Sequence, residues 1–374
     1  MTKISLKGLQ KSYGKLNVFK DLDLTIEDRS YVCLIGPSGC GKSTLMRIIA
    51  GLEEANSGQI LFDGDDVSAL GCADRDVGMA FQNYALYPHL DVAGNLRFPL
   101  LAPRYRGMYS KKEIADRVGT IAELLEIGHL LHRNIGQLSG GQQQRVSLGR
   151  SLIRRPKVLL LDEPVTHLDA RLRYAMRSEL RRIHEVMGTT TIHVTHDQQE
   201  ALAMSDHLVL LRNGGIEQQG PPMEVYSEPQ TSFTAGFLGD PPRSIGIVPF
   251  RRNGGGFDLV LGTNAVALPA YLAEACRGST DDSVTIALPA SAINLSGGAM
   301  APVAGTVTAH EMIEGAQRIV LDVGGVHFTT QSSQVRPVAI GDSLSASVDM
   351  SRVQLFSAKT GRRLATEVKE KEIS

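Results

Sequence analysis

The sequence has few cysteines, no long apolar run and no recognisable targeting segment. Its cysteines are Cys33, Cys40, Cys72 and Cys276. They form neither a CxxC pair nor a Cys/His spacing typical of zinc sites, so reduced thiols in a cytoplasmic protein are favoured over a disulfide framework. No apolar run approaches the length of a membrane span, and the first residues, MTKISLKGLQ, lack the apolar segment of a signal peptide. We therefore expect any membrane role to depend on a partner.

The chain also carries almost no net charge. The 374 residues contain 39 Lys and Arg against 40 Asp and Glu. Residues 241–374 alone hold twelve of each sign. This balance argues against an electrostatic footprint for nucleic acid or for an anionic membrane.

The length suggests two domains, and the patterns change near GFLGDPPRS (236–244). Residues 1–239 alternate strand-like and helix-like segments, which predicts an α/β fold with a mainly parallel sheet. Residues 84–155 are mostly helical and predict an inserted helical subdomain. Residues 240–374 contain short alternating strands such as SVTIAL, RIVLDV and VHFTT, separated by turn residues. They predict a small all-β barrel or sandwich.

Several local patterns predict individual elements. YVCLIG (31–36), KVLLLDEP (157–164) and TTIHVTHD (190–197) read as strands, and QILFDGDDV (59–67) as a hairpin turning at Asp63-Gly64. KKEIADRVGTIAELLEIGHLL (111–131) has the pattern of an amphipathic helix. A helical core stripe is expected from Leu172, Met176, Leu180, Ile183 and Met187.

The stretch GPSGCGKST follows a strand and opens a helix, the context of a phosphate-binding loop. Its backbone N–H groups would cradle phosphates, its lysine would reach the β- and γ-phosphates, and its first hydroxyl would ligate Mg²⁺. A chance glycine-rich turn is the alternative. The expected ATP-binding residues are Gly36, Pro37, Ser38, Gly39, Cys40, Gly41, Lys42, Ser43 and Thr44.

Two adjacent acids, Asp162 and Glu163, end the apolar strand VLLLDEP. Buried acids are costly unless they serve a site. We expect Asp162 to join Ser43 in holding Mg²⁺, and Glu163 to orient and deprotonate the attacking water. The alternative is a strand end that turns into solvent.

Three further side chains are candidates by position. Gln82 ends a strand-like run and would contact Mg²⁺ or water, and His196 follows a strand and would donate to the γ-phosphate. Tyr13, in KSYG, would stack on adenine. Each also has a plainer interpretation: a surface glutamine, a structural histidine and an exposed tyrosine before a turn.

The stretch QLSGGQQQR resembles a second anion site, because a serine and two glycines precede a predicted helix. Its candidate residues are Ser139, Gly140, Gly141 and Gln142. Since the chain has one phosphate loop, we expect this stretch to hold the γ-phosphate bound by another copy. A head-to-tail homodimer would then bury two nucleotides.

Together these motifs resemble the ATP-binding cassette (ABC) ATPases. GPSGCGKST matches the Walker A motif, Gln82 the Q-loop, LSGGQQQR the signature motif, VLLLDEP the Walker B motif, and His196 the switch histidine. LDA (168–170) matches the D-loop and implies that Asp169 serves the partner's nucleotide. VTHLDA departs from the usual LSNLDA by placing His167 where the family has Asn.

The finer resemblance is to ATPase subunits of bacterial carbohydrate importers of the maltose-transporter type. FQNYALYPHLDVAGNL, GFLGDPP and KTGRR resemble stretches of that group, and they imply an oligonucleotide-fold-like (TOBE) regulatory domain in the tail. The group's Arg-Pro-Glu motif is replaced by ALPASAINL, which leaves regulatory contacts open. The resemblance also implies that residues Tyr84–Val92 receive a helix of the membrane subunits, although the same residues suit internal packing of the helical segment.

The sequence therefore predicts a peripheral ATPase on the cytoplasmic face of the cell membrane. It would use ATP and Mg²⁺, form a homodimer, and power uptake of a carbohydrate or polyol derivative through two membrane subunits, with a solute-binding protein as indirect partner and no nucleic acid. One alternative keeps the ATPase and changes the cargo to a polyamine, sulfate, phosphate or a metal. Another is a soluble ABC ATPase without a transport role.

Overall fold

The computed structural model describes residues 2–166, 168–254, 256–277, 281–295, 301–313, 315–333 and 335–364. The chain divides into two compact units, residues 1–223 and 224–374. This division precedes the predicted boundary at 239/240 because the second unit takes in the helix α8 (Ser232–Phe237) and most of α7 (Pro222–Ser227). His167 lies outside the described residues.

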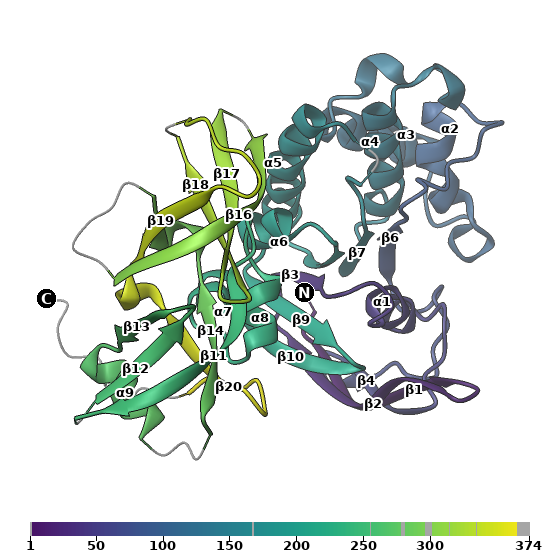
Figure 1. The fold of residues 1–374 in the computed structure, drawn as a ribbon. Helices are drawn as coiled ribbons and strands as arrows, with labels where there is room; N and C mark the ends of the chain where they lie inside the picture. The colour runs from purple at the N-terminus through teal and green to yellow at the C-terminus, as the bar shows by residue number, and fades with distance from the viewer. Residues whose placement is uncertain are drawn as a thin grey trace, which may run out of the picture. The chain divides into compact units, whose positions relative to one another are not determined.

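A six-stranded sheet forms the centre of the first unit (Figure 1). In sheet order its strands are β10 (Gly215–Gly220), β9 (His207–Arg212), β3 (Tyr31–Ile35), β8 (Thr190–Val194), β7 (Val158–Asp162) and β6 (Val77–Ala80). All neighbours pair in parallel except β9 and β10, which are antiparallel. Strands β3, β7 and β8 are buried at every residue, as expected for parallel strands covered on both faces.

A second, antiparallel sheet of the first unit carries the predicted hairpin. In sheet order it contains β2 (Leu16–Ile26), β1 (Ile4–Tyr13), β4 (Ser57–Phe62) and β5 (Asp65–Asp66). The turn between β4 and β5 has left-handed backbone at Asp63 (φ 52°) and Gly64 (φ 92°). This is the geometry that favours an Asp-Gly pair in a two-residue hairpin turn.

The core of this unit surrounds the helix α1 (Lys42–Ala50). Leu45, Met46, Ile48 and Ile49 are each fully buried, and they pack with side chains from both sheets. Burial of four large side chains on one nine-residue helix fixes its position, at about 1.5–3 kcal/mol for each side chain. The loop that precedes α1 is therefore held on a rigid element.

The helical segment predicted at 84–155 is present and gathers beyond β6 and β7 (Figure 1). It contains α2 (Val92–Arg97), α3 (Lys111–Leu124) and α4 (Gly140–Leu152), with 3₁₀ turns at Phe98–Leu101, Pro103–Tyr105, Gly128–Leu130 and Ile135–Gln137. The helices pack closely at Gly149, where an added Cβ would lie 2.7 Å from Leu96 Cδ2. The predicted helix over 111–131 was too long, because Glu126 adopts left-handed backbone (φ 55°).

Two helices follow the strands that carry the candidate acids and histidine. They are α5 (Ala170–Met187), after β7, and α6 (Gln198–Met204), after β8. The predicted stripe on α5 is buried at Met176, Leu180 and Ile183. Its two ends are not core: Leu172 is 37% exposed and Met187 is half-buried.

The second unit is rich in antiparallel strands, as predicted. One sheet has the order β13 (Asn264–Ala267), β12 (Gly256–Leu261), β11 (Ser244–Asn253), β14 (Ser283–Leu288) and β20 (Gln354–Ser357). The other has the order β15 (Ile293–Asn294), β19 (Ser343–Val348), β16 (Ala301–Ile313), β17 (Ala316–Val323) and β18 (Val326–Ser332). Both contribute to one apolar core together with the short helix α9 (Ala270–Cys276), which the sequence analysis did not foresee.

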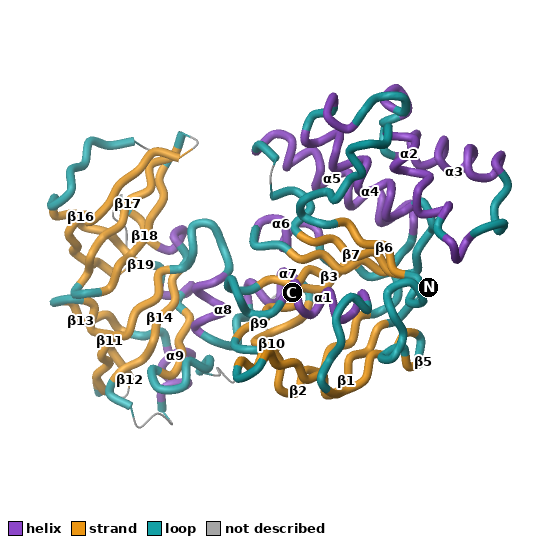
Figure 2. Tube along the Cα trace, turned by 90° about the vertical axis from the view of Figure 1, so that its right-hand side faces the viewer, coloured by secondary structure: helices purple, strands orange, loops and turns teal. Residues whose placement is uncertain are grey.

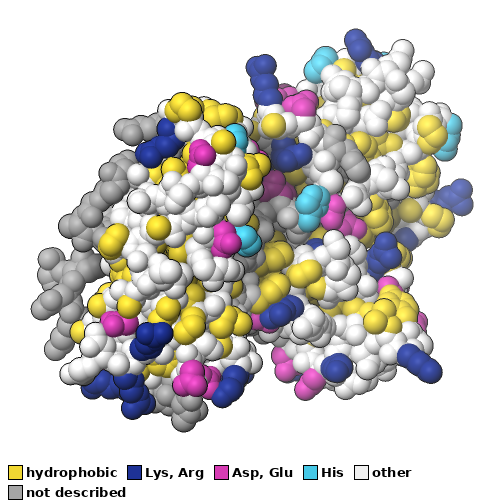
Figure 3. Space-filling model, in the orientation of Figure 1, with side chains coloured by type: hydrophobic (Ala, Val, Ile, Leu, Met, Phe, Trp, Pro, Cys, Tyr) yellow, Lys and Arg dark blue, Asp and Glu magenta, His cyan; other side chains and the backbone are white. Residues whose placement is uncertain are grey.

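The tube in Figure 2 shows helices and strands of the first unit in separate layers and strands dominating the second. The predicted fold class is confirmed: an α/β core with a helical insertion, followed by a smaller β-rich domain. Within the described ranges, no helix combines the length and apolarity that a membrane crossing needs. On the face drawn in Figure 3, Lys and Arg side chains lie interspersed with Asp and Glu.

Candidate ATP site

The predicted phosphate loop joins β3 to α1 and depends on glycine at two positions. Gly36 has a φ of 148°, and a Cβ there would lie 2.2 Å from the carbonyl oxygen of Leu211. Gly41 has a φ of 104°, and a Cβ there would lie 2.7 Å from Cζ of Phe19. Only glycine satisfies both the conformation and the close approach.

The loop presents positive charge and backbone donors. Gly41 is the N-cap of α1 and supplies no side-chain cap, so the first-turn N–H groups have no side-chain acceptor there. The buried Lys42 donates from Nζ to the carbonyl oxygens of Gly36 (2.8 Å) and Pro37 (3.0 Å), which holds the ammonium group over the loop. A helix N-terminus with an adjacent ammonium favours a phosphate group.

Asp162 and Ser43 bring oxygen ligands to the same place. Asp162 ends β7, and Ser43 Oγ lies 3.5 Å from its Oδ1. Burial, followed by the charge of neighbouring Glu163, raises the pKa of Asp162. A cation beside the two carboxylates would stabilise the charged form of Asp162 against both its burial and its repulsion by Glu163.

The donors fit Mg²⁺ in particular. Among the described residues, no group of three or more His, Cys, Asp or Glu side chains is arranged to hold a metal ion. A hydroxyl and one carboxylate suit Mg²⁺, which keeps several waters and is commonly completed by phosphate oxygens.

Glu163 lies at the centre of a polar cluster. Its backbone is left-handed (φ 47°), and its N–H donates to the carbonyl oxygen of Val194 at 2.9 Å. Three groups gather at its Oε2: Gln82 Nε2 donates at 2.8 Å, Thr166 Oγ1 donates at 3.2 Å, and His196 Nδ1 lies 3.4 Å away. The structure thus brings together the three predicted catalytic side chains, Glu163, Gln82 and His196.

The predicted adenine contact, Tyr13, lies at the end of β1. Its hydroxyl donates to Glu53, which raises the pKa of the tyrosine, and Lys11 Nζ lies 4.8 Å from the ring centroid. The residue remains 48% exposed. Its hydroxyl is therefore engaged while part of the ring is open to a stacking partner.

The signature stretch starts α4, as predicted. Ser139 is its N-cap: its Oγ accepts from the N–H of Gln142 at 3.4 Å, and the Gln142 side chain accepts from the N–H of Ser139 at 3.0 Å. Ser139, Gly141 and Gln142 line a pocket of about 310 Å³ that also receives Arg145. The exposed Leu172 of α5 lines this pocket too, which accounts for its absence from the core.

The signature stretch and the phosphate loop lie apart within the chain. α4 and α1 are on opposite sides of β6 and β7 in both views (Figures 1 and 2). Among the described hydrogen bonds, none joins Ser139 to the phosphate loop or to Glu163. The D-loop Asp169 is the N-cap of α5 and accepts from the N–H of Leu172 at 2.9 Å.

Sequence reasoning missed a buried network behind His196. Tyr31 Oη and His193 Nδ1 lie 2.8 Å apart, His193 Nε2 lies 3.6 Å from Glu200 Oε1, and Thr195 donates to Glu200. Burial lowers the pKa of His193, so the imidazole is neutral. The signal was present in TTIHV, a fully buried strand containing polar residues. Thr166 was missed as well, although it follows Glu163 by three residues.

Comparison with known proteins gives concordant results. Residues 19–166 match the family described as ABC transporter. The sn-glycerol-3-phosphate import ATP-binding protein UgpC 1 of Rhizobium johnstonii is 43% identical, over 97% of this chain and 96% of the relative. The sulfoquinovosyl glycerol transport ATP-binding protein SmoE of Agrobacterium fabrum is 39% identical, over 97% of this chain and the whole of the relative.

Solved structures agree with the fold of the first unit. The dimeric structure of MJ0796, a bacterial ABC transporter cassette, is similar with a TM-score of 0.53 and 31% identity, covering 59% of this chain and 98% of that one. A post-hydrolysis state of MJ0796 bound to ADP and Pi gives the same TM-score at 30% identity, with the same coverage of both chains. The chain therefore belongs to the ABC transporter family and is one of its ATP-binding, ATP-hydrolysing subunits.

Proposed function

We propose that this chain is the ATPase subunit of an importer for a carbohydrate or polyol derivative. The observation that carries the hydrolytic part is the cluster at Glu163 Oε2, where Gln82, Thr166 and His196 converge beside a phosphate loop. Relatives named for import of glycerol 3-phosphate and transport of sulfoquinovosyl glycerol support the transport part.

Each site residue has a role in this proposal. The phosphate loop Gly36–Thr44 binds the phosphates through its N–H groups and Lys42, and the open face of the Tyr13 ring stacks on adenine. Glu163 accepts a proton from the attacking water, while Gln82 and His196 orient its carboxylate and the γ-phosphate. Mg²⁺, held by Ser43 and Asp162 with Gln82 nearby, supplies charge neutralisation at the phosphate oxygens.

A second copy completes the site. Ser139 to Gln142, with the D-loop Asp169, are proposed to contact the nucleotide of the partner subunit. The support is that α4, which Ser139 caps, lies on the other side of β6 and β7 from α1. The dimeric cassette among the similar structures supports this arrangement. Helix α4 begins with Gly140 and Gly141, whose N–H groups at a helix N-terminus suit a phosphate.

The segment Tyr84–Val92 is proposed to receive the membrane subunits. It is firmly held: the carbonyl oxygen of Tyr84 accepts from Ser147 Oγ at 2.8 Å, and Tyr87 packs on Phe98 with 4.3 Å between ring centroids. Phe98 remains 42% exposed, which leaves an apolar contact for a partner. Because Gln82 lies two residues before this segment and donates to Glu163, movement there would reach Glu163. The chain would thus act peripherally, at the cytoplasmic face of the membrane.

The two relatives suggest a cargo that contains glycerol and an anionic group. The test is to purify the chain with the membrane subunits and binding protein encoded beside it, and to measure ATP turnover in proteoliposomes. We expect turnover to rise with glycerol 3-phosphate or a sugar conjugate, and not in complexes carrying Glu163→Gln. Stimulation by spermidine, sulfate or a metal ion alone would favour the alternative cargoes.

A further inference from the structure

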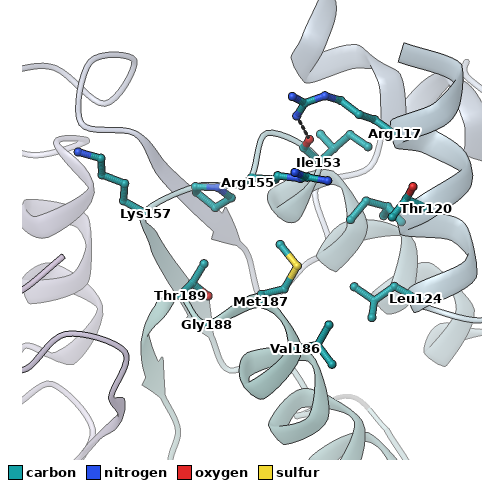
Figure 4. A pocket seen from close by; sticks show the side chains of 12 residues that line it. Arg117, Thr120, Leu124, Ile153, Arg155, Lys157, Val186, Met187, Gly188 and Thr189 are labelled. Carbon is teal, nitrogen blue, oxygen red and sulfur yellow. Dashed lines mark hydrogen bonds between the residues drawn. The ribbon is translucent and has the colours of Figure 1, made fainter. Parts of the chain in front are cut away.

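A cavity of about 500 Å³ opens in the first unit, away from the residues assigned to ATP (Figure 4). Three segments line it: α3, the turn that precedes β7, and the end of α5 with the turn that precedes β8. We call it the arginine cavity; its lining includes Arg117, Leu124, Arg155, Lys157, Met187 and Thr189.

The arginine cavity has a strong imbalance of charge. Arg117, Arg155 and Lys157 line it, and no acidic residue does. None of the three forms an ion pair within the part of the chain that the structure describes. In Figure 4, Arg155 lies between Arg117 and Met187, whereas Lys157 extends away from them. Arg117 Nη1 donates to the carbonyl oxygen of Ile153 at 3.4 Å, and its guanidinium lies 4.6 Å from the Tyr109 ring centroid. Its remaining N–H groups and those of Arg155 are placed to meet an anion at the cavity.

The cationic groups stand on one side of the cavity. Arg155 is exposed, and its backbone is left-handed (φ 57°). Thr189 lines the opposite wall, but it is 8% exposed and its Oγ1 is buried. The polar contacts of a ligand would therefore come from the arginines.

The remaining wall is apolar. Leu124, Val186 and Met187 line it, and Val186 is 63% exposed. Met187 thus forms a cavity wall instead of the core that the α5 stripe predicted. A site with cationic groups at one part and aliphatic side chains at another suits an amphiphilic anion better than an inorganic one.

We propose that the arginine cavity binds a small amphiphilic carboxylate. Its carboxylate would accept from Arg155 and Arg117, and its aliphatic body would pack on Leu124 and Met187. A cavity of this volume matches small-molecule sites. The proposal concerns binding alone and is independent of the cargo.

The test is a calorimetric titration of the full-length protein with decanoate, without nucleotide. Decanoate is kept below its critical micelle concentration. We expect saturable binding of one decanoate per chain. Arg155→Asn removes the charge while tolerating left-handed backbone, and it should weaken binding about tenfold. Thr189→Val keeps the shape of this wall and removes only a buried hydroxyl, so it should bind as wild type does. Lys112→Gln, an exposed cation of α3 outside the cavity, is the matched control and should bind as wild type does.

Three results would overturn the proposal. The first is absence of saturable binding, the second is equal binding of the neutral decyl glucoside or of acetate, and the third is unchanged affinity in folded Arg155→Asn. Circular dichroism establishes that each variant is folded. If Arg155→Asn does not fold, Arg117→Gln takes its place with the same expected loss.

Discussion

Gln82 Nε2 donates to Glu163 Oε2 over 2.8 Å, which joins the loop after β6 to the end of β7. The pair connects the segment proposed to meet the membrane subunits with the proposed catalytic base. A shift of the loop would break this bond or carry the carboxylate with it. If the segment meets the membrane subunits as proposed, this hydrogen bond would carry their movement to the carboxylate of Glu163.

The first prediction concerns the base. Glu163→Gln keeps the shape of the side chain but cannot accept a proton from water, so ATP turnover should fall at least about a hundredfold while ATP binding persists. Steady-state phosphate release and equilibrium binding of a fluorescent ATP analogue measure the two quantities. Thr166→Val, which removes one donor to Glu163, is the companion variant and should lose less activity. Turnover near the wild-type rate in Glu163→Gln would assign the base elsewhere.

A second prediction follows from the raised pKa of Asp162, whose causes are burial and the charge of Glu163. Protons compete with Mg²⁺ for this carboxylate, so the Mg²⁺ concentration needed for half-maximal nucleotide binding should rise as pH falls from about 7.5 to about 5. Glu163→Gln removes one cause of the raised pKa and should make this rise smaller. Titrations with Mg²⁺ at several pH values measure it. A rise of the same size in Asp162→Asn would show that another group is responsible.

Much of this site was predictable because its residues stand in short local motifs. The phosphate loop, the acids Asp162 and Glu163 and the capping serine of α4 depend on neighbours within a few residues, which sequence shows directly. Antiparallel strands of the second unit were predictable for the same reason, because the alternation of apolar and polar residues along each strand is a local pattern.

What was missed depends on pairing between distant segments. Tyr31 meets His193 because β3 and β8 are parallel neighbours, with Cys33 opposite His193. No pattern within either strand reveals that register. The end of α3 at Leu124 depends on one left-handed residue, Glu126, against a continuing apolar period. On α5, Leu172 and Met187 fit the helical spacing of apolar residues, but they line pockets and are not part of the core. Tertiary packing alone decides which residues of such a stripe become core.

The third prediction concerns the buried histidine. The pKa of His193 is lowered, chiefly by burial, so the folded state keeps it neutral. An unfolded histidine takes up a proton near pH 6.5, and stability is therefore lost as pH falls below that value, by up to about 1.4 kcal/mol per pH unit. His193→Asn should show a shallower decline between about pH 7 and 5.5 in urea unfolding followed by circular dichroism. An equally steep decline in the variant would mean that other groups dominate.

The fourth prediction concerns the domain boundary. Every residue proposed to contact the nucleotide precedes 239, and the first unit has its own apolar core. A fragment of residues 1–239 should therefore bind ATP with an affinity within about threefold of the full chain. Its folding is checked first by circular dichroism and its affinity by calorimetry. A folded fragment that does not bind ATP would contradict the proposed division.

The fifth prediction tests whether Ser139 serves the nucleotide of the partner subunit. Lys42→Ala and Ser139→Arg each damage both sites of a homodimer if the sites are shared. A mixed dimer then contains one site with intact Lys42 and intact Ser139, and one site damaged on both sides. The mixture should regain ATP-dependent dimerisation with one tightly held nucleotide, measured by size exclusion with labelled ATP in an ATP-trapping Glu163→Gln background.

Ser110→Arg is the matched control, because Ser110 caps α3 with the same capping box but lies outside the signature stretch. Its homodimer should trap ATP unaided, which separates loss of a helix cap, about 1 kcal/mol, from loss of a ligand contact. If the folded mixture traps no ATP while the control does, Ser139 acts within its own subunit and the shared-site arrangement is wrong.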